Sequence, residues 1–196
     1  GFSGTHHIHL ADWADAAIVA PASYNFIGKI AHGIADDLIT TIFAAVHSPV
    51  VIAPAMNVNM WNNPVLQNNI DNLENLGYII CPPEEGFLAE GYDGKGRLAP
   101  LHHLIQDIYR AIHPSAESLA GKSVLITAAR TEEPIDAVRY ISNRSSGKMG
   151  YSLAWEAYAR GAEVTLVSGP SHLPMPHSMT VVSLNTAKQM YDEVKQ

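Results

Sequence analysis

Apolar runs alternate along the chain with amphipathic segments, and this alternation predicts the secondary structure. Short continuous apolar runs are typical of strands buried in a parallel sheet. Such runs cover residues 16–20, 50–53, 78–81, 124–127, 164–167 and 181–183. The segments between them have apolar residues three or four positions apart, which predicts helices that pack on the sheet. The pattern therefore indicates an α/β protein with parallel sheets.

Three of the expected helices have recognisable ends or faces. Ser23 has the side chain of a helix cap, and Asn63 can cap a helix that has Pro64 in its first turn and ends before Gly77. The helix after Asn63 completes a βαβ unit with the runs on either side of it. The expected inward stripes are Ile27, Ile30, Ala31 and Ile34; Leu66, Ile70 and Leu73; and Leu101, Leu104, Ile105, Ile108 and Ile112.

A domain boundary is expected in the second half of the chain. The periodic pattern breaks over residues 113–118, and a fresh strand, helix and strand begin at Gly121. We therefore expect two domains, which cover residues 1–114 and residues 118–196.

Charge and composition narrow the classes of partner. The chain has 196 residues, of which 47% are hydrophobic and 16% are charged, and its net charge is -7. A negative charge disfavours nucleic acids and anionic membranes as partners, and no apolar run has the length of a membrane span. The single cysteine, Cys81, excludes an internal disulfide and suits the reducing cytoplasm.

The segments that carry candidate chemistry each follow an apolar run. Open α/β folds bind ligands beyond the carboxyl ends of their strands, so these segments are candidate site loops. They cover residues 21–25, 54–57, 82–96, 128–133 and 168–170. The sequence therefore predicts functional groups gathered at one edge of a sheet.

Residues 54–61, with the sequence PAMNVNMW, carry the most specific pattern in the chain. Taken alone, they would be interpreted as a strand-to-helix turn in which the Met and Trp side chains merely pack. The complete pattern, however, resembles the substrate-clamp motif of phosphopantothenoylcysteine decarboxylases, which are flavoproteins of coenzyme A synthesis. We call residues 54–61 the clamp segment.

Two further segments resemble the same family, in the expected order. Residues 7–38, which include HIHL, APASYN and ADDL, are similar to the region that binds flavin and holds the catalytic histidine. Residues 133–150, which include EPID and ISNRSSGKMG, are similar to phosphopantothenate-cysteine ligase, which many bacteria fuse behind the decarboxylase. The resemblance implies a Rossmann-like flavoprotein domain, followed by the start of a second α/β domain that binds a nucleotide. It also implies a homo-oligomer, with a trimer-based decarboxylase and a ligase dimer, that acts on small molecules.

The resemblance assigns roles in an FMN-dependent decarboxylation to residues of the first domain. The family uses FMN to oxidise the cysteine side chain of the substrate, which allows the carboxylate to leave as carbon dioxide. His7 stands in the position of the base or proton relay. Asn57 stands in the position of the group that binds the substrate carboxylate. Met60 and Trp61 would exclude water from this carboxylate. The implied flavin-binding residues are Ala22, Ser23, Asn25 and Asp37.

His7 has two other interpretations. The chain contains ten histidines, and a histidine outside a motif is most often a solvated surface residue. A metal site formed by His6, His7 and His9 is disfavoured, because no carboxylate or cysteine stands at ligand spacing nearby. We therefore expect no metal here.

Residues 88–98 resemble the substrate flap of the family in their glycine spacing, with one departure. Many bacterial members have a cysteine where this chain has Glu90, and that thiol serves the final reduction. Cys81 lies nine positions earlier, at the end of an expected strand, so we interpret it as a small buried apolar residue. Three alternatives stay open: Glu90 supplies the proton, another group supplies it, or the reduction is impaired.

In the second domain, the resemblance implies a ligase that uses CTP with Mg²⁺. Asn143 would serve an acyl-cytidylate intermediate, while Ser145, Ser146 and Lys148 at a helix start would meet phosphate. A solvated helix cap explains the Ser-Ser-Gly-Lys segment equally well. The departures from the family pattern are Ala129, Arg130 and Glu132, in place of Gly, Pro and Arg.

We expect the chain to be a fragment that lacks the first part of the decarboxylase and most of the ligase. Family members begin with a strand, a glycine-rich turn and a helix around the flavin phosphate, and this sequence has no such segment. An alternative from a different class is a non-catalytic FMN-binding regulatory or interaction protein of the same fold. His7 together with Asn57 favours the enzyme, whereas Glu90 keeps the alternative open.

Overall fold

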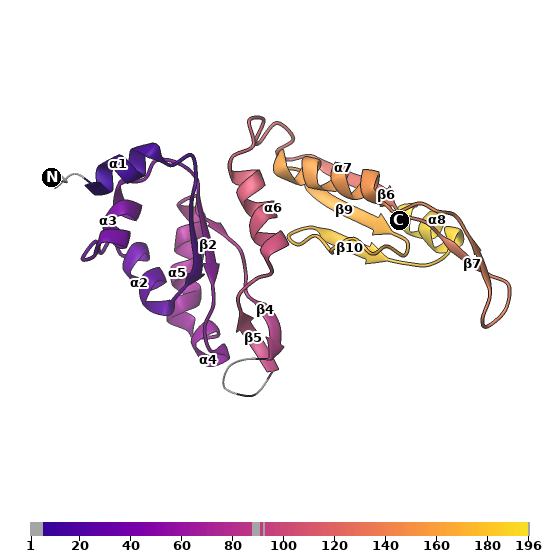
Figure 1. The fold of residues 1–196 in the computed structure, drawn as a ribbon, viewed down its shortest axis with the longest axis horizontal. Helices are drawn as coiled ribbons and strands as arrows, with labels where there is room; N and C mark the ends of the chain where they lie inside the picture. The colour runs from indigo at the N-terminus through magenta and orange to yellow at the C-terminus, as the bar shows by residue number, and fades with distance from the viewer. Residues whose placement is uncertain (1–5, 88–90, 92, 196) are drawn as a thin grey trace. The chain divides into compact units, whose positions relative to one another are not determined.

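A computed structural model describes residues 6–87, 91 and 93–195. The chain divides into two units, Gly1–Ile112 and His113–Gln196, which we call unit 1 and unit 2. Figure 1 shows that each unit has its own sheet and its own covering helices. The α/β class with parallel sheets is confirmed in both units.

The sheet of unit 1 has three parallel strands in the order β1-β2-β3. These are β1 (Ala17–Ala22), β2 (Val50–Pro54) and β3 (Ile79–Ile80). All five residues of β2 are buried, as expected for the central strand. The pairing runs from Ala17 beside Val50 to Ala22 beside Pro54, so β1 and β2 end at the same edge.

Helices cover both faces of this sheet. On one face, Val50 and Ile52 pack with Ile27 of α2, Phe43 of α3 and Leu66 of α5. On the other face, Val51 and Ala53 pack with Leu104 of α6 and with Cys81. The helices of unit 1 are α1 (His6–Trp13), α2 (Tyr24–Ala31), α3 (Leu38–Ala45), α4 (Val58–Trp61), α5 (Pro64–Asn75) and α6 (Leu101–Ala111).

The predicted helix caps are confirmed, and two of the predicted stripes need correction. Ser23 caps α2, and Asn63 caps α5 with Pro64 in its first turn. Ile27 and Leu104 are buried as predicted. Periodicity shows which residues share a face, but it does not show how far the partner surface extends. The exposed members of the predicted stripes are Leu101, Ile105, Ile112 and Ile34, the last of which lies beyond the end of α2.

An antiparallel hairpin precedes α6 in unit 1. It consists of β4 (Glu84–Phe87) and β5 (Asp93–Arg97). Glu90 lies outside the described residues.

Unit 2 has a three-stranded parallel sheet in the order β10-β9-β6. Ala154, Ala157 and Tyr158 of α7 pack against Val164 and Leu166 of β9. A small antiparallel hairpin, formed by β7 and β8, stands apart from the sheet. The elements are β6 (Ser123–Ala128), β7 (Glu132–Pro134), β8 (Tyr140–Ser142), α7 (Lys148–Ala159), β9 (Glu163–Ser168), β10 (Thr180–Ser183) and α8 (Ala187–Val194).

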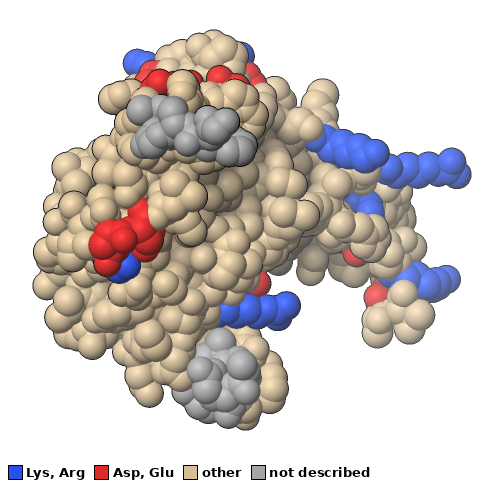
Figure 2. Space-filling view, turned by 60° about the vertical axis from the view of Figure 1, so that its left-hand side comes forward, with Lys and Arg blue, Asp and Glu red and all other residues tan. Residues whose placement is uncertain are grey.

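Two surface properties bear on possible partners. No helix among the described residues has both the length and the apolar character needed to cross a membrane. On the face shown in Figure 2, charged side chains lie in small groups, several of which contain both acidic and basic residues.

Candidate functional site

The carboxyl ends of β1 and β2 bring two predicted site loops together. Ala22 pairs with Pro54, and the Ala55 amide donates a hydrogen bond of 3.2 Å to the Ala22 carbonyl. The residues that follow the two strands, Ser23 and the rest of the clamp segment, therefore start from adjacent points on one edge.

Ser23 and Asn25 lie at the start of α2, beside this edge. The Ser23 hydroxyl accepts a hydrogen bond of 3.2 Å from the Phe26 amide and so caps the helix. Both Ser23 and Asn25 are exposed, whereas Ala22 is fully buried. A hydroxyl, an amide and the positive end of a helix dipole together form a polar surface that suits the polar edge or phosphate of a ligand.

Asn57 caps the short helix α4 and is half-buried. Its Oδ1 accepts a hydrogen bond of 2.8 Å from the Asn59 amide, which fixes the orientation of the side chain. The same side chain carries two N–H groups, which are donors of the kind that a carboxylate requires.

The rest of the clamp segment is held from two sides. Trp61 is buried, and its carbonyl accepts a hydrogen bond from the Gln67 side chain, whereas Met60 is exposed. On the other side, the Met56 amide donates a hydrogen bond of 2.9 Å to the Gly96 carbonyl on β5. A Cβ atom at Gly96 would lie 2.1 Å from the Met56 carbonyl oxygen, so this contact requires glycine. Strand β5 therefore supports the clamp segment directly.

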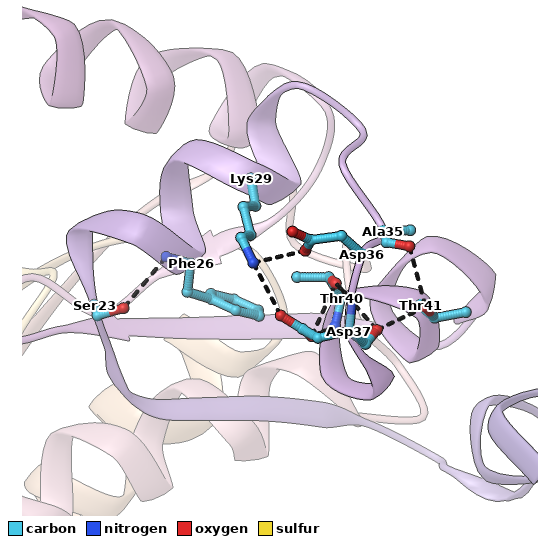
Figure 3. Close-up of polar contacts among 8 residues, drawn as sticks. All are labelled: Ser23, Phe26, Lys29, Ala35, Asp36, Asp37, Thr40 and Thr41. Carbon is cyan, nitrogen blue, oxygen red and sulfur yellow. Dashed lines mark hydrogen bonds and ion pairs between the residues drawn. The ribbon is translucent and has the colours of Figure 1, made fainter.

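Asp37 lies at the other end of α2 from Ser23 (Figure 3). Its carboxylate caps α3 by accepting a hydrogen bond of 2.8 Å from the Thr40 amide, and it also accepts one of 3.1 Å from the Lys29 ammonium. These hydrogen bonds lower the pKa of Asp37 to about 2, and the bond from the Thr40 amide makes the largest contribution. Lys29 also pairs with Asp36 at 2.6 Å, and this bond is the main reason why the pKa of Lys29 is raised. The cluster joins α2 to the start of α3.

His7 and the clamp segment lie at opposite ends of the sheet. His7 is on α1, which leads into the amino end of β1, whereas Asn57 follows the carboxyl end of β2. Figure 1 shows α1 and α4 at opposite ends of unit 1. Within one copy of unit 1, the structure therefore brings Ser23 and Asn25 to the edge that bears Asn57, but it does not bring His7 or Asp37 there.

Cys81 is fully buried, which confirms its interpretation as a small core residue. Burial is the main reason why its pKa is raised, and the neighbouring Asp107 carboxylate raises it further. The thiol therefore stays protonated near neutral pH and is a poor nucleophile. A buried, protonated thiol at Cys81 is therefore not suited to the role of the cysteine that many bacterial family members have at the position of Glu90.

Unit 2 has a cavity of about 490 Å³ between the carboxyl end of β6 and the start of α7. Gly150 and Gly147 allow this close approach, because a Cβ at Gly150 would lie 2.5 Å from the Ala128 side chain and Gly147 has φ of 83°. Asn143 is exposed, outside the cavity lining, and its Oδ1 accepts a hydrogen bond of 2.8 Å from the Ser145 amide. The cavity lining includes the predicted Ser145, Ser146 and Lys148.

Two cations near the candidate sites were not predicted from the sequence. Arg144 lines the cavity of unit 2, and Lys95 lies over the ring of Trp61, 5.5 Å from its centroid. Arg144 adjoins the predicted Ser145, which is a signal that could have identified it. Lys95 lies in the segment that resembles the substrate flap, but its proximity to Trp61 depends on the packing of β5, which the sequence does not show.

Comparison with known proteins identifies the family. The family model described as Flavoprotein matches residues 2–113. The chain belongs to this flavoprotein family. The flavoprotein unit is followed by residues 119–196, which match the DNA/pantothenate metabolism flavoprotein C-terminal domain. The order of these two matches agrees with the order predicted from the motifs.

Curated relatives of this flavoprotein are named coenzyme A biosynthesis bifunctional protein CoaBC. The one from Bacillus subtilis (strain 168) is 48% identical over 191 residues, which cover 96% of this chain and 47% of the relative. The one from Borreliella burgdorferi is 44% identical over 187 residues, which cover 95% of this chain and 48% of the relative. The chain thus spans about half the length of these relatives. The resemblance to the bifunctional family is confirmed.

A solved structure also resembles this flavoprotein. It is a PPC decarboxylase with a cysteine-to-serine mutation, in complex with pantothenoylaminoethenethiol. It is 40% identical, covers 52% of this chain and 57% of its own chain, and has a TM-score of 0.51. The similarity supports a decarboxylase fold for about half of the chain.

Proposed function

We propose that the protein to which this chain belongs is an FMN-dependent decarboxylase that converts phosphopantothenoylcysteine to phosphopantetheine in coenzyme A biosynthesis. We further propose that unit 2 is part of a CTP-dependent phosphopantothenate-cysteine ligase. The observation that carries the first proposal is the pairing of Ala22 with Pro54, which places Ser23 and the clamp segment on one sheet edge. The family and the curated relatives support both proposals.

FMN would bind beside the start of α2. Ser23 and Asn25 are exposed there and offer a hydroxyl and an amide, and the main chain of Ala22 leads into the helix. These groups fit the polar edge of a flavin. When bound, FMN would oxidise the cysteine side chain of the substrate. The oxidised side chain could then accept the electron pair that remains when carbon dioxide leaves. Asp37, which Lys29 and Thr40 hold at the start of α3, lies at the other end of α2 and would therefore not contact a flavin bound here within the same copy.

Asn57 would hold the substrate carboxylate through its side-chain N–H groups. Met60 and Trp61 would cover this carboxylate and exclude water, which strengthens the hydrogen bonds from Asn57. As carbon dioxide leaves, the carboxylate loses its charge and the electron pair moves onto the oxidised cysteine side chain of the substrate. A cation at this position would therefore stabilise the substrate more than the transition state, so a neutral donor suits it better. His7 would take up or deliver the proton.

A second copy of the chain would supply His7. Since His7 and Asn57 lie at opposite ends of the sheet within one copy, one substrate can meet both only where two copies adjoin. We therefore propose a homo-oligomer based on a trimer, with each site shared between neighbours.

Glu90 would donate the proton that is needed when the enethiol left by decarboxylation is reduced to the product thiol with the two electrons that the flavin took from the substrate. A carboxyl group that is desolvated over a bound substrate has a raised pKa and can donate a proton at neutral pH. In unit 2, Ser145, Ser146 and Lys148 would contact phosphate within the cavity at α7, and Asn143 would serve the acyl-cytidylate. CTP would bind there with Mg²⁺.

The decarboxylase proposal is tested by product analysis on the full-length protein. We expect it to be isolated with FMN and to release carbon dioxide and phosphopantetheine from phosphopantothenoylcysteine. The Glu90→Gln variant should release carbon dioxide but accumulate the enethiol or its oxidised form. A protein that binds FMN yet releases no carbon dioxide would instead be a non-catalytic flavoprotein.

A further inference from the structure

Lys95 is held beside the clamp segment by its neighbour in the chain. Gly96 is buried and bonded to the main chain of Met56, so strand β5 is fixed against the clamp segment at this point. The Lys95 ammonium lies 5.5 Å from the centroid of the Trp61 ring, which is within the range of a cation–π contact. The backbone of Lys95 is therefore fixed beside the clamp segment, and its side chain reaches over the Trp61 ring.

The Lys95 ammonium is exposed, and its charged surroundings are known for the described part of the hairpin. Its cross-strand partner in the hairpin is Glu85. Even so, among the residues that the structure describes, the ion pairs do not include Lys95. The side chain is exposed. An exposed cation held over an aromatic face, next to the proposed substrate site, has the properties of an anion-recognition group.

We propose that Lys95 determines substrate specificity by binding the phosphate group of the substrate. This inference rests on the proposed decarboxylase function. The substrate has two anionic groups, and the carboxylate loses its charge during the reaction. A cation paired with the carboxylate would stabilise the ground state more than the transition state and would slow the reaction. The phosphate keeps its charge throughout, so a cation there strengthens binding equally in both states.

The proposal predicts a change in KM that depends on the phosphate. The full-length protein, isolated with its flavin, is assayed with phosphopantothenoylcysteine and with the same molecule without its phosphate. For Lys95→Gln we expect KM for the phosphorylated substrate to rise roughly ten- to a hundred-fold with kcat nearly unchanged, as for the loss of one charge-assisted contact. KM for the substrate without phosphate should stay the same, and Lys95→Arg should restore most of the affinity.

One control variant and the contradicting outcomes complete the test. Lys122→Gln removes the same charge from an exposed position in unit 2 and should leave KM unchanged for both substrates. An equal rise in KM for both substrates, a loss of kcat, or no effect of Lys95→Gln would each overturn the role in phosphate binding. If the wild-type protein converts neither substrate, the decarboxylase proposal fails, and the role of Lys95 fails with it.

Discussion

Asp37 is a single exposed carboxylate that local hydrogen bonds hold in its charged form. The Thr40 amide and the Lys29 ammonium both donate to it, and both interactions favour the ionised state. A carboxyl group with a lowered pKa stabilises the folded state fully above its ordinary value near 3.8, and this contribution is lost as pH falls through about 2. Asp37 therefore stabilises the start of α3 throughout the neutral range.

A titration of Asp37 separates its two partners. In Lys29→Met, we expect the pKa of Asp37 to rise from about 2 but to stay below 3.8, because the Thr40 amide makes the larger contribution. Carboxyl chemical shifts followed by NMR from about pH 5 downwards would give both values. A pKa that does not change in the variant would contradict the role assigned to Lys29.

Gly96 is the second residue whose identity the structure explains. In Gly96→Ala, the new Cβ would lie 2.1 Å from the Met56 carbonyl oxygen, so β5 must move away from the clamp segment. We expect the free energy of unfolding to fall by roughly 1–3 kcal/mol, as for other overpacked positions, and decarboxylation to weaken. Chemical denaturation checks the first effect.

Gly28→Ala is the matched control for this change. Gly28 lies within α2, and a Cβ added there would meet no atom within 4 Å, so alanine should stabilise the helix by roughly 0.5–1 kcal/mol. Equal effects of the two substitutions would show that the contact between Gly96 and Met56 is unimportant.

At the scale of elements, strands and helices with strong periodic patterns could be predicted from the sequence. Strand β2 and helix α5 agree with the apolar run at residues 50–53 and with the cap at Asn63. The hairpin of β4 and β5 could not be predicted as strands, because the sequence DGKGR of β5 has no apolar alternation. Its position depends on the contact between Gly96 and Met56, which joins residues far apart in the chain.

Strand β6 is followed by a residue whose backbone is strained. Ala129 has φ of 66°, in the left-handed region that favours glycine, and it lies against Gly147 at the start of α7. We expect Ala129→Gly to raise the free energy of unfolding of unit 2 by roughly 0.5–1 kcal/mol, because relief of strain exceeds the added entropy of the unfolded chain.

Ala154→Gly provides the contrasting change, since Ala154 lies within α7 and is fully buried. It should lower stability by at least about 0.5–1 kcal/mol. Denaturation followed by circular dichroism compares the variants, and a loss of stability in Ala129→Gly would contradict the strain at this position.

For the whole molecule, the sequence predicted that Ser23 and the clamp segment share one edge, but it did not predict that His7 lies at the opposite end of the sheet. The adjacency of Ser23 and the clamp segment follows from the rule that parallel strands end at one edge, and the structure has this adjacency. The separation of His7 from Asn57 depends on the direction of α1 relative to β1, which no local pattern specifies.

A shared site predicts complementation between two inactive variants. His7→Asn and Asn57→Asp should each abolish decarboxylation when expressed alone. When both are expressed together, each retains the residue that the other lacks, so mixed oligomers should recover roughly a quarter of the wild-type activity under random assembly. Mixed oligomers that contain both variants yet remain inactive would show that one copy supplies both residues.

The decarboxylation rate of Asn57→Asp tests the central claim most directly. The change keeps the size of the side chain and its capping oxygen, but it places a negative charge beside the substrate carboxylate, which a water-poor site would repel strongly. In the full-length protein, we expect the variant to keep its fold and its FMN absorbance while the release of carbon dioxide from phosphopantothenoylcysteine falls by more than about a hundred-fold. Turnover near the wild-type rate, with flavin bound, would contradict the assignment of the clamp segment as the site of decarboxylation.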